Sequence, residues 1–561
     1  MSVFLEKIVT ALSGPTGLAE EEIRVLIETP RDPQHGEYAF PCFVLAKSLR
    51  KGPPAIAKDL AEKLAGSMDF TPSPTGAYLN FRIPSRRLAE EVLPLIRQQA
   101  EAYGRSEEGK GKTILLDYSH PNIAKPFGIG HLRSTVIGAA LRNIFEALGY
   151  RTVSINHLGD WGTQFGKMIA AYRRWGDEEA LKKDPIEYLY GLNTRFHREA
   201  KTDESLDVDG RERFRELEEG KEEALALWKR FRELSLEEFM RIYHRLGISF
   251  DSYAGESFYN KKAEEAVREV EEKGVAYEHE GALVVDLDGL PTCLIRKSDG
   301  TTLYLTRDLA AAEYRYETYE FDHLIYVVGA PQKLHFRQLF GLIRKLGYSW
   351  WDRCEHVEFG HILGMKTRDG TLIFLEEVLN EARDRALRTM RESVEKRFDL
   401  EDEESVAEAV GLGVVIFNDL SGRRIKDVHF DWDRLLSFDG DSGPYLQYAH
   451  ARMEGILRKC GIEVPDRIDP GLLVEDEAAT LLRLLERYPS VLQQAGRNRE
   501  PSIICRFILD LARAVSVAYP VLRVKDEAAP LAEARLLLLW SVKQVLASGL
   551  RVIGMQPIER M

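Results

Sequence analysis

The sequence contains no long apolar run. No stretch of about 18 consecutive apolar residues occurs in the 561-residue chain, so we expect no transmembrane helix. Residues 1–7 lack the basic start and the continuous apolar core of a secretory signal peptide. We therefore expect a cytoplasmic protein that does not bind membranes.

Cysteine is scarce and scattered. The five cysteines never form a C-x-x-C pair, which argues against a disulfide framework and against a cysteine zinc site. No other cluster with metal-ligand spacing stands out, so we predict no metal-binding residue.

An excess of positive charge is also missing. The chain has 77 Lys and Arg against 90 Asp and Glu, a net charge of −13, which argues mildly against a general polyanion binder. A local basic face would still suffice for RNA, and an acidic remainder would reject non-specific RNA. The length predicts more than one domain.

Residues 113–150 carry the clearest chemical signal. The apolar run from Ile114 to Leu116 has the length of a buried parallel strand. A turn with Gly128 and Gly130 follows, and from Leu132 the apolar residues take helical spacing. This arrangement presents backbone N–H groups and a positive helix end to a phosphate. It also fits an ordinary strand-to-helix connection, because a glycine-rich turn alone is a weak signal.

A second strand at residues 152–157 completes a β-α-β unit, which predicts a parallel sheet with ligands beyond the carboxyl ends of its strands. The run G-D-W-G-T-Q-F-G at 159–166 lies on the same edge. It fits a rigid loop around Trp161 and a pocket-shaping loop equally well.

The turn itself resembles the first signature of class I aminoacyl-tRNA synthetases in its arginyl-tRNA synthetase form. Its P-N-I-A-K-P-F start and G-H-L-R-S end, at 121–134, both match. The resemblance implies ATP binding by Gly128, Gly130, His131 and Ser134, with Lys125 and His131 as catalytic contacts to the phosphates. Gly128 departs from the pattern, because the family normally has a histidine there.

Residues 361–371 take the place of the family's second signature, the K-M-S-K-S loop, in degenerate form. The resemblance implies ATP contacts by Gly364, Met365, Lys366 and Thr367, and catalytic roles for Lys366 and Arg368. Thr367 stands where the second lysine usually is, and arginyl enzymes with this loss carry a lysine in the first signature, here Lys125. The alternative is a basic surface turn.

For the amino acid, the resemblance implies contacts by Asp117, Asn122, Tyr304, Asp308 and Gln332. Tyr304 and Asp308 are four residues apart at the start of a predicted helix, so both can face one pocket. A guanidinium is best recognised by carboxylates that accept two parallel N–H bonds. No β-rich editing domain is indicated, and a charged, forked substrate would not need one.

The flanking segments complete the predicted organisation. Residues 1–105 form an α+β unit whose D-x-x-H-G-E-Y-A run, at 32–39, resembles the family's N-terminal domain, which implies contact between Tyr78 and Asn80 and the tRNA elbow. Residues 106–400 form the sheet domain with a charged helical insertion at about 175–260, and 401–561 form a helical anticodon-binding domain. The implied tRNA contacts in that last domain are Arg423, Arg424, Gln447, Tyr448 and Arg452.

We therefore predict an α/β multidomain protein with a Rossmann-like parallel-sheet catalytic core, an N-terminal α+β domain and a C-terminal all-α helical bundle. The resemblance implies a ligase that activates L-arginine with ATP, giving arginyl-adenylate and pyrophosphate, and then charges the 3′-terminal ribose of tRNA(Arg). ATP implies Mg²⁺, and a monomer is expected. Two alternatives stay open: a class I synthetase for another amino acid, and a tRNA-binding protein that has lost catalysis.

Overall fold

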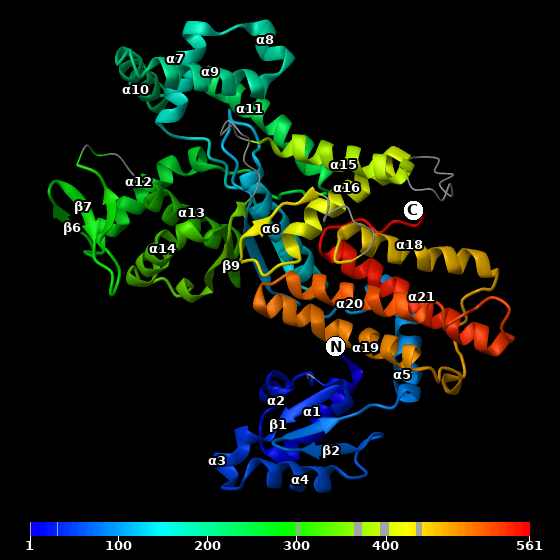
Figure 1. The fold of residues 1–561 in the computed structure, drawn as a ribbon. Helices are drawn as coiled ribbons and strands as arrows, with labels where there is room; N and C mark the ends of the chain where they lie inside the picture. The colour runs from blue at the N-terminus through cyan, green and yellow to red at the C-terminus, as the bar shows by residue number, and fades with distance from the viewer. Residues whose placement is uncertain are drawn as a thin grey trace.

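The computed structural model describes residues 2–30, 32–298, 300, 303–363, 373–392, 403–432 and 440–561. Along the chain follow a small α+β unit, a parallel-sheet domain with a helical projection, and a helical bundle (Figure 1). This arrangement confirms the predicted fold class. No helix among the described residues is long and apolar enough to cross a membrane.

The N-terminal unit is an antiparallel sheet covered by helices. The strand order is β1-β3-β2, and the buried residues Phe4, Phe40 and Phe81 form part of the core beneath α1. The elements are α1 (Val3–Thr16), α2 (Glu20–Leu26), β1 (Tyr38–Pro41), α3 (Ala46–Leu49), α4 (Pro53–Leu64), β2 (Pro72–Thr75) and β3 (Tyr78–Phe81).

Helix α5 (Ser85–Gln99) leaves this unit and lies against the C-terminal helices (Figure 1). Just beyond it, the Tyr103 hydroxyl donates to the Leu485 carbonyl over 3.0 Å. The predicted boundary at residue 105 therefore falls after a helix that packs elsewhere, and the domain boundaries stay predictions.

The central sheet is parallel, in the order β10-β9-β4-β5. Its strands are β4 (Thr113–Asp117), β5 (Arg151–Ile155), β9 (His323–Gly329) and β10 (Cys354–Phe359). Helix α6 (Leu132–Ala147) connects β4 to β5, as the β-α-β pattern predicts. Ile114 and Leu116 share a core with α6, whereas Leu115 faces α13 (Tyr304–Tyr319) and α14 (Lys333–Lys345). Because β4 is buried on both faces, it is apolar from Ile114 to Leu116, between Thr113 and Asp117.

The segment after β5 is almost entirely helical. It contains α7 (Thr163–Trp175), α8 (Glu178–Lys183), α9 (Pro185–Glu199), α10 (Ser205–Glu218), α11 (Glu222–Arg245) and α12 (Glu256–Glu272). Helices α7 to α10 and the start of α11 form the projection at the top of Figure 1, whereas α12 packs against α13 lower in the view. The strands that follow, β6 (Tyr277–His279), β7 (Ala282–Val285) and β8 (Cys293–Arg296), pair antiparallel with one another. They form a separate small sheet and do not extend the parallel one.

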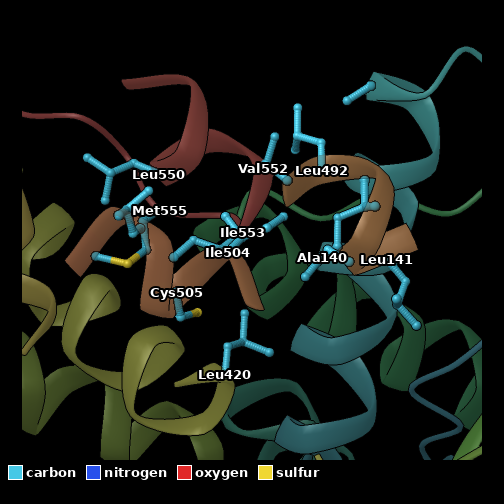
Figure 2. Close-up of a cluster of buried hydrophobic side chains, with 14 of the residues drawn as sticks. Ala140, Leu141, Leu420, Leu492, Ile504, Cys505, Leu550, Val552, Ile553 and Met555 are labelled. Carbon is cyan, nitrogen blue, oxygen red and sulfur yellow. The ribbon is translucent and has the colours of Figure 1, made fainter. Parts of the chain in front are cut away.

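The C-terminal part contains α15 (Leu375–Glu392), α16 (Glu403–Leu420), α18 (Gly443–Cys460), α19 (Asp476–Asn498), α20 (Ser502–Ala518) and α21 (Ala529–Val552). A short parallel pairing joins β11 (Ile362–Leu363) to β12 (Val428–His429). Ala140 and Leu141 of α6 lie in one buried cluster with Leu492, Ile504 and Ile553 (Figure 2). The sheet domain and the helical bundle thus share a core through α6.

A buried carboxyl group connects the N-terminal unit to the bundle. Glu486 of α19 accepts hydrogen bonds from the hydroxyl of Tyr38, at 2.6 and 2.7 Å, and from that of Ser2. Nearby, Arg483 Nε lies 2.8 Å from a carboxylate oxygen of Glu37. Burial raises the pKa of Glu486 to about 7, although the two hydroxyl donors oppose this shift.

We predict that Glu486→Gln stabilises the protein increasingly as the pH rises. The pKa of Glu486 is higher in the folded state than its ordinary 4.5, so its contribution is complete below pH 4.5 and is lost as the pH rises through about 7. One pKa unit corresponds to about 1.4 kcal/mol, so the loss reaches about 3 kcal/mol. The melting temperatures of the variant and the parent, compared between pH 5 and pH 8, measure this loss of stability. Glu477→Gln on the same helix is the control, and a variant-minus-parent difference that is independent of pH contradicts the prediction.

Candidate active site

The carboxyl end of β4 places Asp117 beneath the signature turn, where both of its carboxylate oxygens are occupied. Oδ2 lies 2.9 Å from Arg315 Nη1, and Oδ1 lies 2.8 Å from His120 Nε2. Burial alone would raise the pKa of Asp117, but the charge of Arg315, followed by that of His120, holds it well below its ordinary range. Asp117 is therefore an ionised, fully engaged group. The chain's own guanidinium, that of Arg315, thus contacts Asp117, and the predicted contact of Asp117 with arginine stays a prediction.

Arg315 is a buried arginine in the wall of this site. It lies on α13, its guanidinium contacts the rings of Tyr259 and Tyr326 at 5.9 and 5.6 Å, and Nη2 donates to His157 Nδ1 over 3.2 Å. Sequence reasoning missed it. The available signal was its distance of seven residues from Asp308, which puts the two on one face of a helix.

Asp308 remains accessible. Its side chain is about one quarter exposed, and Oδ2 lies 2.6 Å from His335 Nε2. No other partner of its carboxylate occurs in the described part of the chain. His335 was not predicted, yet it follows Gln332 by three residues at the start of α14, so both can face the same side. Gln332 and Tyr304, the latter 63% exposed, lie open at the same edge.

Asn122 is packed against the 159–166 loop. Gly159 donates its N–H to the carbonyl of Pro121 and accepts from Ile123 N, at 3.1 and 3.2 Å. A Cβ at position 159 would lie 2.0 Å from Asn122 Oδ1. Only glycine at 159 leaves room for the Asn122 amide at this place.

The signature turn positions one cation and one neutral ring. Lys125 Nζ donates to Gln164 Oε1 over 3.3 Å. His131 stacks on Phe127 with a 5.3 Å centroid separation and an angle of 3°. Burial lowers the pKa of His131 to about 4, so the imidazole is neutral at pH 7. Gly130 is exposed, and a Cβ there would meet no atom within 4 Å, so its backbone is open to a ligand.

Ser134 does not present a free hydroxyl. Its Oγ accepts from Ser119 N at 2.9 Å and donates to the Val327 carbonyl at 2.6 Å, and the side chain is buried. It joins β4, α6 and β9 at the sheet edge. Its predicted contact with ATP is not supported by this geometry.

The second signature falls largely outside the described residues, which exclude Gly364, Met365, Lys366, Thr367 and Arg368. Both of its flanks are described. Before it, the Leu363 carbonyl accepts from Phe430 N at 3.3 Å. After it, Ile373 O accepts from Ile129 N at 3.1 Å, and Leu375 N donates to Phe127 O at 2.8 Å. The chain therefore returns from the second signature directly onto the first.

The 159–166 loop joins the sheet to the helical projection. The buried Asp160 accepts from Arg232 Nε at 3.0 Å and from both Ser257 N and Ser257 Oγ at 2.8 Å. Trp161 packs edge-on against Phe214 and Trp228. Since Gln164 reaches Lys125 from this loop, both predicted roles, rigid packing and pocket shaping, are compatible with the structure.

A large groove of about 1760 Å³ opens between the projection and the start of α13. Exposed aromatic rings line it together with charged groups of both signs. Its lining includes Phe258, Tyr304, Lys261, Arg268, Arg307 and Glu264. Since Tyr304 lines the groove one helical turn before Asp308 on α13, the groove lies next to the candidate arginine contacts.

The predicted RNA contacts of the N-terminal unit differ in accessibility. Tyr78 is half-buried and stands edge-on to the exposed Phe43, with centroids 6.0 Å apart. Asn80 is only 4% exposed, so its side chain is not at the surface in this structure.

The predicted RNA contacts of the C-terminal bundle also differ in accessibility. Arg423 and Tyr448 are exposed, and Arg452 stacks on the ring of Tyr519 at 3.4 Å. Arg424 donates to the Glu358 and Arg499 carbonyls, at 2.6 and 3.0 Å. Gln447 is fully buried.

The Gln447 amide donates to the carbonyls of Ala409 and Gln556, both at 3.0 Å. The structure gives Gln447 a packing role and does not support its prediction as an RNA contact.

Three sequence families match the chain in succession. Residues 3–83 match the arginyl tRNA synthetase N terminal domain, residues 93–432 match the catalytic domain of tRNA synthetases class I (R), and residues 446–561 match the DALR anticodon binding domain. The catalytic-domain match alone covers more than half of the chain and includes every candidate residue of the pocket and of both signatures.

Full-length relatives agree. The chain is 45% identical to the arginine–tRNA ligase of Halothermothrix orenii, with 100% of both chains covered, and 46% identical to arginine–tRNA ligase 1 of Bacillus cereus, with 97% of each covered. The arginyl-tRNA synthetase structure from Thermus thermophilus superposes with a TM-score of 0.85 at 26% identity and covers 100% of both chains. The chain belongs to the arginyl-tRNA synthetases of class I.

Proposed function

We propose that the chain joins L-arginine to tRNA(Arg) at the expense of ATP, with the chemistry at the carboxyl edge of the parallel sheet. One observation carries this assignment: an accessible carboxylate, Asp308, and a cationic glycine-rich turn with Lys125 belong to the same sheet edge. A carboxylate there suits a guanidinium, and a cation there suits a phosphate.

In the first step a carboxylate oxygen of arginine attacks the α-phosphate of ATP. The P–O bond to pyrophosphate breaks as the new one forms, giving arginyl-adenylate. Such a transfer depends on positioning and on stabilising charge at the phosphate oxygens. We assign to Lys125 the role of stabilising the negative charge of the phosphate oxygens. The open backbone at Gly130 and the neutral ring of His131 are assigned to hydrogen bonding with ATP. Lys366 and Arg368 are proposed as further cations from the second signature.

The arginine side chain is assigned to Asp308, with Tyr304 and Gln332 as neutral partners. Because Asp117 is saturated by Arg315 and His120, we assign it a positioning role in the pocket floor. Asn122 is proposed to contact the amino acid from the side of the 159–166 loop.

In the second step a hydroxyl of the 3′-terminal ribose attacks the carbonyl carbon of the adenylate, and AMP leaves. The groove beside Tyr304 is a suitable channel for the unpaired acceptor end. Exposed rings such as Phe258 offer stacking surfaces for bases, and Lys261 and Arg268 offer contacts for phosphates.

We take MgATP as the nucleotide substrate. No group of three or more His, Cys, Asp or Glu side chains is placed to hold a metal ion anywhere in the described ranges, and Mg²⁺ commonly binds through substrate phosphates. Action as a monomer in the cytoplasm stays a prediction.

Pyrophosphate exchange into ATP tests the proposal. We expect arginine-dependent exchange in the presence of tRNA(Arg) and little exchange without it. The described part of the site offers Lys125 as a cation for the phosphates, and the second signature is proposed to supply the remaining positive charge, so we expect the site to be incomplete without tRNA. Lysine and citrulline in place of arginine are the specificity controls. Strong exchange without tRNA would contradict the predicted dependence of arginine activation on tRNA. No exchange under any condition would favour a protein that has lost catalysis.

Asp308→Asn should raise the KM for arginine at least about tenfold, equivalent to about 1.4 kcal/mol, because it removes the accessible charge partner of the guanidinium. The exposed Glu317 lies on the same helix, so Glu317→Gln is the matched control. An unchanged KM for arginine in the Asp308 variant would show that the pocket lies elsewhere.

Lys125→Ala should lower adenylate formation by about 10²–10³, the usual cost of removing a group that stabilises charge in the reaction, while arginine binding is retained. Lys112→Ala, an exposed lysine before β4, is the control, and exchange in the presence of tRNA is the measurement. Gly128→His should change the rate only modestly. Near-full activity of the Lys125 variant, or an inactive parent that Gly128→His activates, would overturn this assignment.

A further inference from the structure

We propose that the groove between residues 421–424 and the start of α20 binds the phosphate backbone of tRNA, with Arg423 and Arg506 as its cationic contacts. This inference rests on the proposed function, since it names where the RNA partner touches the chain outside the pocket. Arg506 did not stand out in the sequence, because it is a single arginine within an amphipathic helix.

The groove is a defined surface feature of about 560 Å³. Two elements far apart in sequence form it: the residues that follow α16, and the junction of α19 with α20. Its polar lining includes Ser421, Arg423, Arg424, Asn498, Ser502 and Arg506. The groove therefore combines neutral hydrogen-bond donors with guanidinium groups. This mixture is typical of surfaces that bind nucleic-acid backbones.

The two proposed contacts are uncommitted cations. Arg423 and Arg506 are exposed, and neither has an ion-pair partner within the described ranges. The neighbouring Arg424 differs, because its guanidinium is held by two backbone carbonyls. The one acid of the groove, Glu500, is engaged by Ser502 Oγ at 2.9 Å and by Arg424 N at 3.2 Å. The chain has a net charge of −13, so two arginines on one groove without an acidic partner among the described residues mark a local positive surface.

The place of the groove in the fold favours RNA over a small anion. The Arg424 carbonyl accepts from Gly360 N at 3.0 Å, so the groove adjoins the carboxyl end of β10. Its other wall belongs to the C-terminal bundle. A ligand that spans this groove lies beside both the end of β10 and the bundle, and an extended polyanion can do so with several phosphates.

The segment that carries Arg423 is also attached to both signatures. The buried Arg133, in the first turn of α6, pairs with Asp419 at 3.1 Å and donates to the Lys426 carbonyl at 2.8 Å. Asp427 accepts from His361 N, at the start of the second signature, over 2.7 Å. RNA bound to Arg423 thus rests on a segment that is hydrogen bonded to both reacting loops.

The test uses the full chain with Arg506→Gln, Arg423→Gln and the double variant. We expect each single change to raise the KM for tRNA about fivefold to tenfold and to reduce the slope of log KM against log salt by about one, because one phosphate contact is lost. The kcat at saturating tRNA and the binding of arginine and ATP should match the parent. Arg344→Gln, which removes an exposed arginine from α14, should behave as the parent in every assay.

The outcomes distinguish a failure of the RNA groove from a failure of the proposed function. If the parent charges tRNA(Arg) but the double variant keeps the parent's KM for tRNA and its salt slope, the groove does not bind RNA. If the KM rises equally in the Arg344 variant, only net charge matters and the specific site is refuted. If the parent itself does not charge tRNA(Arg), the proposed function fails. A melting temperature equal to that of the parent confirms that the exposed substitutions leave the fold intact.

Discussion

The ion pair between Asp117 and Arg315 is the interaction on which the site depends. It joins the last residue of β4 to α13, and both side chains are almost fully buried. Removing one partner of such a pair commonly costs about 3–5 kcal/mol, because the other charge is left uncompensated. The pair fixes the helix that carries Tyr304 and Asp308 against the strand that leads into the signature turn. Asp308 and the signature turn are therefore parts of one packed unit.

A second buried pair extends this constraint to the helical bundle. Arg133 and Asp419 lie 3.1 Å apart with 1% and 2% of their side chains exposed, and α6 also shares its apolar core with the bundle (Figure 2). The helix that follows the first signature is thus a structural part of both domains. A change of position at the bundle has a direct route to the signature turn, through packed side chains and the hydrogen bond from the Arg133 guanidinium to the Lys426 carbonyl.

The sequence predicted the repetitive and local parts of this arrangement. The β-α-β unit around residues 113–155 follows from the apolar periodicity and from the glycine-rich turn. The predicted roles of Asp117, Ser134 and Gln447 stay predictions, but sequence reasoning did not anticipate the partners that these side chains find far away in the chain. Asp117 pairs with Arg315, Ser134 donates to the Val327 carbonyl of β9, and Gln447 donates to two backbone carbonyls. Such pairings arise from tertiary packing, which no local pattern encodes.

The charge at the phosphate site follows from the same packing. His131 stacks on Phe127, and its burial lowers its pKa to about 4, so it offers a hydrogen bond without a charge at neutral pH. Gly128 offers no side chain. Of the two cations in the first signature, Arg133 is paired with the buried Asp419, whereas Lys125 donates to Gln164 of the 159–166 loop. Ile129 N donates to the Ile373 carbonyl and Leu375 N donates to the Phe127 carbonyl, so residues 373–375 are hydrogen bonded to the same turn. The turn that carries Lys125 is therefore held by two distant chain segments, the 159–166 loop and residues 373–375.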